Sequence, residues 1–213
     1  MDLRILPLQT VLFPGMRLPL HIFEDRYRRM VRECLEEDAP FGVVLIKSGA
    51  EVGAGATPHN IGTAARILQA EYLDDGRMNI FTIGQHRFRI VTLNTTEPYL
   101  RGEVQLLDQQ RAPVTDAIAN ARGLFEDYLK TYLALGNQWT RGVQLPDDAG
   151  EAADYIAARL DVPLQMKQDL LEELSPDARL GREVELIREE LPDMRLRLAA
   201  LLRQKTSGFG VMN

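Results

Sequence analysis

The chain changes character near residue 110, and this change constrains its fold more than any other feature. Before that point, short apolar runs alternate with turn residues, at positions 6–8, 18–20, 41–47, 63–73, 77–84, 86–94 and 99–107. Many short runs of this kind are typical of a β-barrel or β-sandwich. After that point, apolar residues recur at helical spacing, in runs at 113–135, 150–161, 163–174 and 175–191. We therefore predict an α+β chain with its strands first and its helices after them.

The stretch from Leu6 to Val31, LPLQTVLFPGMRLPLHIFEDRYRRMV, gives this prediction its detail. Two Leu-Pro-Leu triplets enclose Phe-Pro-Gly, and Pro-Gly favours a turn between two strand segments. The charged residues that follow predict one helix inserted among the strands, beginning at Asp25. Its apolar stripe consists of Tyr27, Met30, Val31, Cys34 and Leu35. Burial on that stripe, rather than reactivity, is the expectation for Cys34.

Composition narrows the classes of partner. The 213 residues are 45% hydrophobic and 26% charged, as in ordinary globular proteins, and the formal net charge is −6. An acidic chain lacks the positively charged surface that would attract nucleic acids or anionic membranes. A single cysteine allows no intrachain disulfide and fits a reducing compartment. With no signal peptide and no apolar run of about 20 residues, we predict a cytoplasmic protein without a membrane partner.

Catalytic motifs are missing from the sequence. A nucleotide-binding P-loop needs Gly-Lys followed by Ser or Thr, and the chain has no Gly-Lys dipeptide. The glycine-rich run at 49–55 is better interpreted as a hairpin loop than as a phosphate cradle. Lys47 and Ser48 are neighbours on a predicted strand and would point to opposite faces, which excludes a Ser–Lys dyad. The three histidines are scattered. We therefore predict no catalytic residue, no metal and no cofactor.

Two sets of residues remain as candidates for binding. Phe13, Pro14 and Met16 in the turn, with Phe23 before the helix, would give an apolar surface if they were exposed. Core packing and turn geometry are the alternative interpretation for each of them. Arginines on the helix, at 26, 28, 29 and 32, form either a solvated, partly neutralised face or a docking site for an acidic partner or an RNA backbone.

The stretch from Leu6 to Val31 resembles the start of the Lon protease N-terminal domain, the LON substrate-binding family. Similar blocks follow in order at 61–90, 97–105 and 156–174, and the form IFEDRY looks most like the short, stand-alone members. The resemblance implies a PUA-like β-barrel with one inserted helix, followed by a C-terminal α-helical bundle. The change near residue 110 places the barrel at 1–110 and the helical subdomain at 111–205, and we expect a disordered tail at 206–213.

The resemblance also implies a function. It suggests a non-catalytic module that binds unfolded or degradation-marked protein segments, in substrate recognition or as an adaptor for a separate protease. The ATPase and Ser–Lys peptidase activities of the full protease do not carry over, and a peptidase label would be inherited from the longer relatives. A strand edge could add a peptide strand, and the candidate binding residues are Phe13, Pro14, Met16, Phe23, Arg26 and Arg29. An RNA-binding PUA-like protein is the alternative, which the acidic balance opposes.

Overall fold

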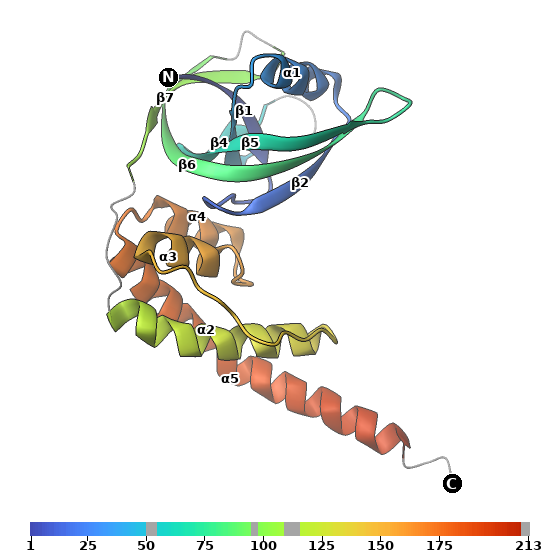
Figure 1. Cartoon of the computed structure of the whole chain (residues 1–213), viewed down its shortest axis with the longest axis vertical. Coiled ribbons are helices and arrows are strands. Elements are labelled where there is room, and N and C mark those ends of the chain that lie inside the picture. The colour runs from blue at the N-terminus through green and yellow to red at the C-terminus, as the bar shows by residue number, and fades with distance from the viewer. Residues whose placement is uncertain (50–54, 95–97, 109–115, 210–213) are drawn as a thin grey trace. The chain divides into compact units, whose positions relative to one another are not determined.

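The computed structural model describes residues 1–49, 55–94, 98–108 and 116–209, with the side chains of 116–117 and 205–209 left out (Figure 1). The chain divides into two compact units. Unit 1 comprises Met1–Gln110 and Asp161–Leu174, and unit 2 comprises Arg111–Leu160 and Ser175–Asn213. The predicted mixed α/β character, with strands first and helices after them, is confirmed.

A seven-stranded sheet forms most of unit 1. Its strands are β1 (Asp2–Leu8), β2 (Arg17–Ile22), β3 (Phe41–Ser48), β4 (Thr57–Pro58), β5 (Ile61–Tyr72), β6 (Met78–Asn94) and β7 (Leu100–Leu106). They are ordered β1-β7-β6-β5-β3-β4, with β2 paired to β6. Strand β1 also pairs with β3 in parallel, whereas the other pairings are antiparallel. Strands β1, β7, β6, β5 and β3 therefore form a closed cycle of pairings, because β3 pairs with β1.

Helix α1 (Asp25–Glu36) lies beside the strands of unit 1 (Figure 1). Its apolar stripe is buried in the core of this unit. The predicted start at Asp25 is confirmed, as is the burial of Tyr27, Met30, Val31 and Cys34. These side chains join a cluster that also includes Leu6, Phe41, Met78 and Ile80 from the strands. Burial raises the pKa of the Cys34 thiol to about 11, so this thiol stays protonated at neutral pH.

Helix α4 (Leu164–Glu172) belongs to unit 1, although it follows two helices in the sequence. The buried Arg87 of β6 donates from Nε to the carbonyl oxygen of Leu171 over 2.8 Å. Gln168, fully buried, donates from Nε2 to the carbonyl oxygen of Ile61 over 3.0 Å. The sequence grouped this segment with the helical part at 111–205, and the structure instead packs it against strands. The predicted domain limits themselves stay a prediction.

Unit 2 contains α2 (Asp116–Leu135), α3 (Ala149–Ala157) and α5 (Pro176–Phe209). The Asp148 side chain caps α3 by accepting from the backbone N–H groups of Gly150 and Glu151. Helix α5 continues through Pro192. It also includes 206–209 of the predicted tail, whereas 210–213 lie outside the described residues.

None of the helices in the described part of the chain has the length and apolar character needed to cross a bilayer.

Candidate functional site

The predicted apolar turn is folded against β6. Gly15, at a φ of +74°, donates to the carbonyl oxygen of Gly84 over 2.9 Å, and the Gly84 N–H donates to the carbonyl oxygen of Met16 over 2.9 Å. These bonds hold Phe13 inward, and its exposed fraction is 0%. The expectation that Phe13 is exposed is therefore wrong, and the core-packing interpretation holds for it. Met16 is half-buried against the core cluster, and Pro14 is half-buried.

Phe23 is exposed as expected, with 49% of its surface accessible. It follows β2 and stacks on His21, with 6.1 Å between ring centroids. Nδ1 of His21 lies 2.8 Å from Oδ1 of Asn79 on β6. The aromatic ring of Phe23 is therefore held beside the outer surface of the β2–β6 pair.

A second exposed aromatic residue, Phe81, lies on that same surface. In the register, Pro19 of β2 and Gln69 of β5 flank Phe81 on β6. The alternate residues Leu18 and Leu20 pack against the core, so Pro19 and Phe81 point outward. Phe81 is 50% exposed. We call Pro19, His21, Phe23, Asn79 and Phe81 the β2–β6 face.

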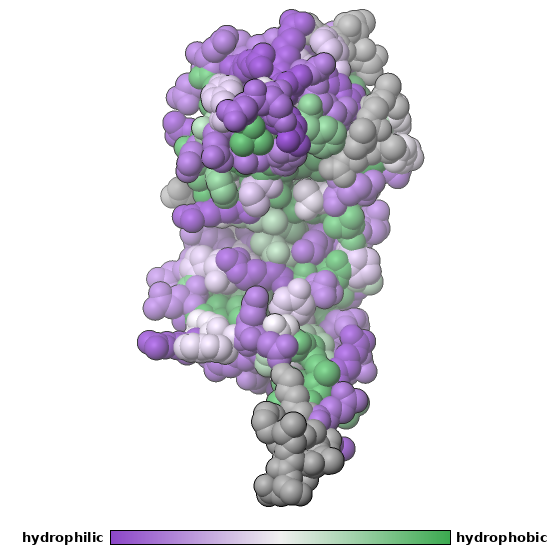
Figure 2. All heavy atoms as spheres, turned by 90° about the vertical axis from the view of Figure 1, so that its right-hand side faces the viewer, coloured by the Kyte–Doolittle hydropathy of each residue, from purple (hydrophilic) through white to green (hydrophobic). Residues whose placement is uncertain are grey.

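The sequence analysis missed Phe81, although strand alternation carried the signal. Its neighbours Ile80 and Thr82 are buried, which places Phe81 on the opposite, outer side. In the surface view of Figure 2, hydrophobic residues of unit 1 lie among hydrophilic ones and do not form one continuous apolar area. On the face that Figure 2 shows, apolar side chains of this unit therefore have polar neighbours.

The outer edge of β2 is poorly suited to adding a strand. Because Gly84 and Met16 form a hydrogen-bonded pair, the register makes Leu18 and Leu20 hydrogen-bonded partners of β6. The main-chain groups of the intervening residues then face away from β6, and the middle one is Pro19, which has no N–H to donate. Proline in this position is a common protection of edge strands. The side chains of the β2–β6 face are thus better placed for binding than the edge.

Three of the four candidate arginines of α1, Arg26, Arg28 and Arg29, pair with acidic neighbours. Nη2 of Arg26 lies 2.9 Å from Oε2 of Glu24, and Nε of Arg29 lies 2.8 Å from Oε1 of Glu33. Arg28 pairs with Asp25. The structure therefore agrees with a partly neutralised face for these residues. As binding residues, Arg26, Arg29, Pro14 and Met16 stay predictions.

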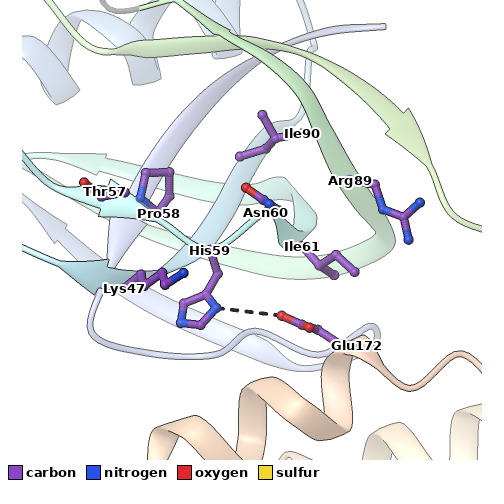
Figure 3. Close-up of a pocket in the computed structure, with 9 residues that line it drawn as sticks. All are labelled: Lys47, Thr57, Pro58, His59, Asn60, Ile61, Arg89, Ile90 and Glu172. Carbon is purple, nitrogen blue, oxygen red and sulfur yellow. Dashed lines mark ion pairs between the residues drawn. The ribbon is translucent and has the colours of Figure 1, made fainter.

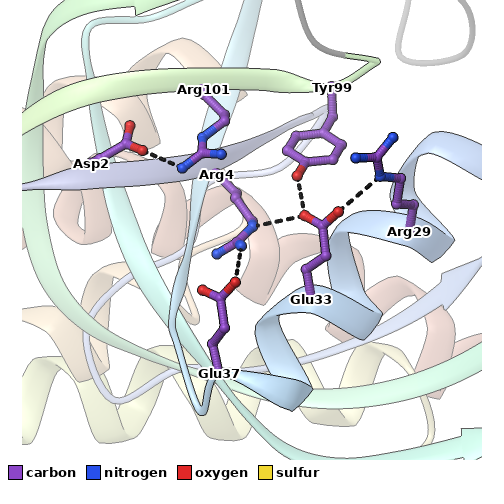
Figure 4. A network of polar contacts seen from close by, with 7 residues as sticks. All are labelled: Asp2, Arg4, Arg29, Glu33, Glu37, Tyr99 and Arg101. Atoms are coloured by element: carbon purple, nitrogen blue, oxygen red, sulfur yellow. Dashed lines mark hydrogen bonds and ion pairs between the residues drawn. The ribbon is translucent and has the colours of Figure 1, made fainter.

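Glu33 is also the centre of a polar network that joins α1 to the sheet (Figure 4). It accepts a hydrogen bond from the hydroxyl of Tyr99 and another from Nε of Arg4 on β1 over 3.2 Å. Nη2 of Arg4 also lies 2.6 Å from Oε1 of Glu37. The Tyr99 hydrogen bond, with the bonds from Arg29 and Arg4, lowers the pKa of Glu33 to about 2. The network stabilises the position of α1, and the sequence analysis did not anticipate it.

A separate pocket of about 440 Å³ lies beside β4 in unit 1 (Figure 3). Its lining consists of Lys47, Thr57, Pro58, His59, Asn60, Ile61, Arg89, Ile90 and Glu172. Nδ1 of His59 lies 3.7 Å from Oε1 of Glu172, which also accepts from Nε2 of Gln168 over 2.8 Å. Of the glycine-rich run at 49–55, residues 50–54 lie outside the described residues. Within the described ranges, no three His, Cys, Asp or Glu side chains gather as a metal site requires.

Comparison with known proteins places this geometry in a family. The sequence model of the ATP-dependent protease La (LON) substrate-binding domain matches residues 2–189. Lon protease 2 of Myxococcus xanthus is 28% identical over 91% of this chain, and Lon protease of Xanthomonas oryzae pv. oryzae is 32% identical over 90%. The chain spans about a quarter of the length of these relatives, 24% and 23%. The match is to the substrate-binding domain and not to protease or ATPase domains.

Solved structures agree with this assignment. A Lon N-terminal domain protein from Xanthomonas campestris has a TM-score of 0.66 and 26% identity, over 85% of this chain and 96% of that one. The N-terminal domain of a Mycobacterium avium complex Lon protease has a TM-score of 0.61 over 88% and 98% of the two chains. At 19% identity, the second shows the fold alone. The chain thus belongs to the LON substrate-binding domain family.

Proposed function

We propose that this chain is a non-catalytic protein-binding module that recognises unfolded or degradation-marked polypeptide segments through its β2–β6 face. The observation that carries the proposal is the pair of half-exposed aromatic rings, Phe23 and Phe81, on the outer surface of one strand pair. Membership of a family described as substrate-binding, with relatives named Lon proteases, supports it.

The chemistry of the β2–β6 face suits clients without a fixed sequence. Aromatic rings bury large apolar area at low cost in conformational entropy, so they bind many apolar side chains. Asn79, which contacts His21, also donates from Nδ2 to Oε2 of Glu71 over 3.4 Å, so polar groups border the rings. The polar pair His21–Asn79 lies between Phe81 and Phe23 in the register, so the face offers both apolar and hydrogen-bonding contacts to a client.

Three further points belong to this proposal. The module acts in the cytoplasm, either in recognition of clients or as an adaptor for a separate protease. Its sheet is a PUA-like barrel, which is supported by pairings that return from β3 to β1. Its barrel subdomain takes 1–110 with α4 packed against the strands, and its helical subdomain takes the rest of 111–205.

RNA binding is not favoured. Phosphate contacts need unneutralised cations, yet Arg26, Arg28 and Arg29 each pair with a carboxylate. The net charge of −6 also repels the negatively charged RNA backbone.

The proposal is tested with the double variant Phe23→Ser/Phe81→Ser, by measuring binding to β-casein, a natively unfolded protein, in a pull-down and by fluorescence anisotropy. Both rings are half-exposed, so we expect folding to persist and binding to weaken about tenfold or more. The matched control is Trp139→Ser, which removes a residue of unit 2 that is 75% exposed. Equal binding by the double variant and the wild type would refute the β2–β6 face as the site. Casein cleavage by the purified chain would refute a non-catalytic role.

A further inference from the structure

The pocket beside β4 has a charge balance opposite to that of the whole chain. The chain carries a net charge of −6, but the lining has the cations Lys47 and Arg89 and a third basic residue, His59, against one acid, Glu172. That acid is already engaged by His59 at 3.7 Å and by Gln168 at 2.8 Å. The charges of Lys47 and Arg89 are therefore left uncompensated in the pocket.

Four side chains of this pocket have no partner within the described residues. Within the part of the chain that the structure describes, the side chains of Lys47 and Arg89 make no ion pair or hydrogen bond, and neither do those of Thr57 and Asn60. Nearby main-chain groups are already used, because His59 donates to the carbonyl oxygen of Leu45 and Ile90 donates to that of Asn60. The side chains of Lys47, Arg89, Thr57 and Asn60 therefore offer hydrogen-bonding groups to a ligand.

The shape of the pocket suits a small molecule. Its volume of about 440 Å³ falls in the range of known ligand sites. Pro58 and Ile61 are buried and Ile90 is half-buried, so they form apolar walls. Figure 3 shows Lys47 and Arg89 on opposite sides of the group of lining residues. Cationic and polar groups therefore surround an apolar interior.

We propose that this pocket binds a small ligand that carries an oxyanion, either a carboxylate or a phosphate. Lys47 supplies charge-assisted hydrogen bonds to the oxyanion, and Thr57 and Asn60 supply neutral ones. The charge of Arg89, on the opposite side, adds electrostatic attraction for the anion. Pro58, Ile61 and Ile90 contact the body of the ligand. The site is independent of the proposed client binding, because no residue of the β2–β6 face lines it.

The test is titration of the full chain, followed by ¹H–¹⁵N NMR, with inorganic phosphate, with acetate and with a short apolar peptide whose C-terminus is free or amidated. We expect saturable chemical-shift changes centred on the pocket residues. They should appear with phosphate, with acetate or with the peptide whose C-terminus is free. Saturation by phosphate identifies a phosphate ligand. Saturation by acetate or by the free but not the amidated peptide identifies a carboxylate ligand.

The double variant Lys47→Gln/Arg89→Gln should weaken this binding about tenfold or more, because a charged donor and a second positive charge of the pocket are lost. Both residues are exposed, so the fold should persist, and thermal unfolding checks this. The matched control Arg122→Gln/Arg188→Gln removes two exposed cations of unit 2. Absence of saturation by every probe overturns the proposal, as does equal weakening in the control, which would indicate a general charge effect.

Discussion

The Nε atom of Arg87 donates a hydrogen bond to the carbonyl oxygen of Leu171 over 2.8 Å, inside the protein. Carbonyl groups in the last turn of a helix have no partner within the helix, and a cation there also complements the helix dipole. A side chain of strand β6 thus supplies the hydrogen-bond donor for a carbonyl group at the C-terminal end of α4.

We predict that Arg87→Met lowers the free energy of unfolding by about 2 to 3 kcal/mol, because it leaves a buried carbonyl oxygen without its donor. Urea denaturation measures the change, and hydrogen exchange should show α4 opening first. Arg89→Met, an exposed change two residues along β6, is the control and should stay within about 0.5 kcal/mol. Equal effects from the two variants would show that the contact with α4 contributes nothing.

The Glu33 network predicts a dependence of stability on pH. The pKa of Glu33 is about 2 in the folded chain, below its ordinary value of 4.5. A lowered carboxylate pKa stabilises the fold above pH 4.5, and this contribution disappears as pH falls toward 2. Glu33→Gln should therefore be less stable than the wild type at pH 7, by about 1 to 2 kcal/mol after solvent screening.

This difference should shrink as the pH falls through that window, when unfolding in urea is compared at several pH values. The control Glu36→Gln removes an exposed carboxylate of the same helix and should show no such trend. A constant gap between wild type and Glu33→Gln down to pH 2 would contradict the prediction.

Two glycine substitutions should act in opposite directions. A Cβ atom on Gly84 would lie 2.3 Å from the carbonyl oxygen of Phe13, so Gly84→Ala must push the turn away from β6. We expect a loss of about 1 to 3 kcal/mol. Gly123→Ala, in α2, meets nothing within 4 Å and should stabilise by about 0.5 to 1 kcal/mol. Thermal unfolding distinguishes the two, and stabilisation by Gly84→Ala would contradict the packing of the turn.

Pro19 should protect the outer edge of β2 against pairing with a strand of another molecule, and a substitution tests this. Pro19→Ala restores an N–H that faces away from β6, and we expect it to increase self-association through edge pairing. Light scattering after size-exclusion chromatography at increasing concentration measures this. Pro192→Ala, an exposed proline of α5, is the control and should remain unchanged. An unaltered mass for Pro19→Ala would show that the edge is protected by something other than the proline.

Local patterns predicted much of this fold. The helical spacing of Tyr27, Met30 and Cys34 predicted the buried side of α1 because periodicity depends on neighbours in sequence. Asp75-Gly76 between two apolar runs is a local hairpin signal, and Gly76 adopts a φ of +81° in the β5–β6 turn. These features need no knowledge of distant residues.

Local sequence patterns did not predict the contacts between segments that are distant in the chain. Phe13 is buried because its turn bonds to Gly84, which is far along the chain, and a local motif is the same whether its aromatic ring points inward or outward. Arg87 carries a charge, so alternation marks it as a surface residue, yet it is 2% exposed and bonds to a helix 84 positions away. The pocket combines β3, the residues around β4, β6 and α4, and no single motif encodes it.

The placement of α4 has a consequence for how the chain can be divided. The polypeptide leaves unit 1 after Gln110, returns at Asp161 and leaves again after Leu174, so three covalent crossings connect the two units. A fragment that stops at residue 110 would lose the acceptor of Arg87 and the Glu172 wall of the pocket. Gene fusions, truncations and limited proteolysis therefore cannot separate the units with one cut, and evolution could not have exchanged either unit as one uninterrupted segment.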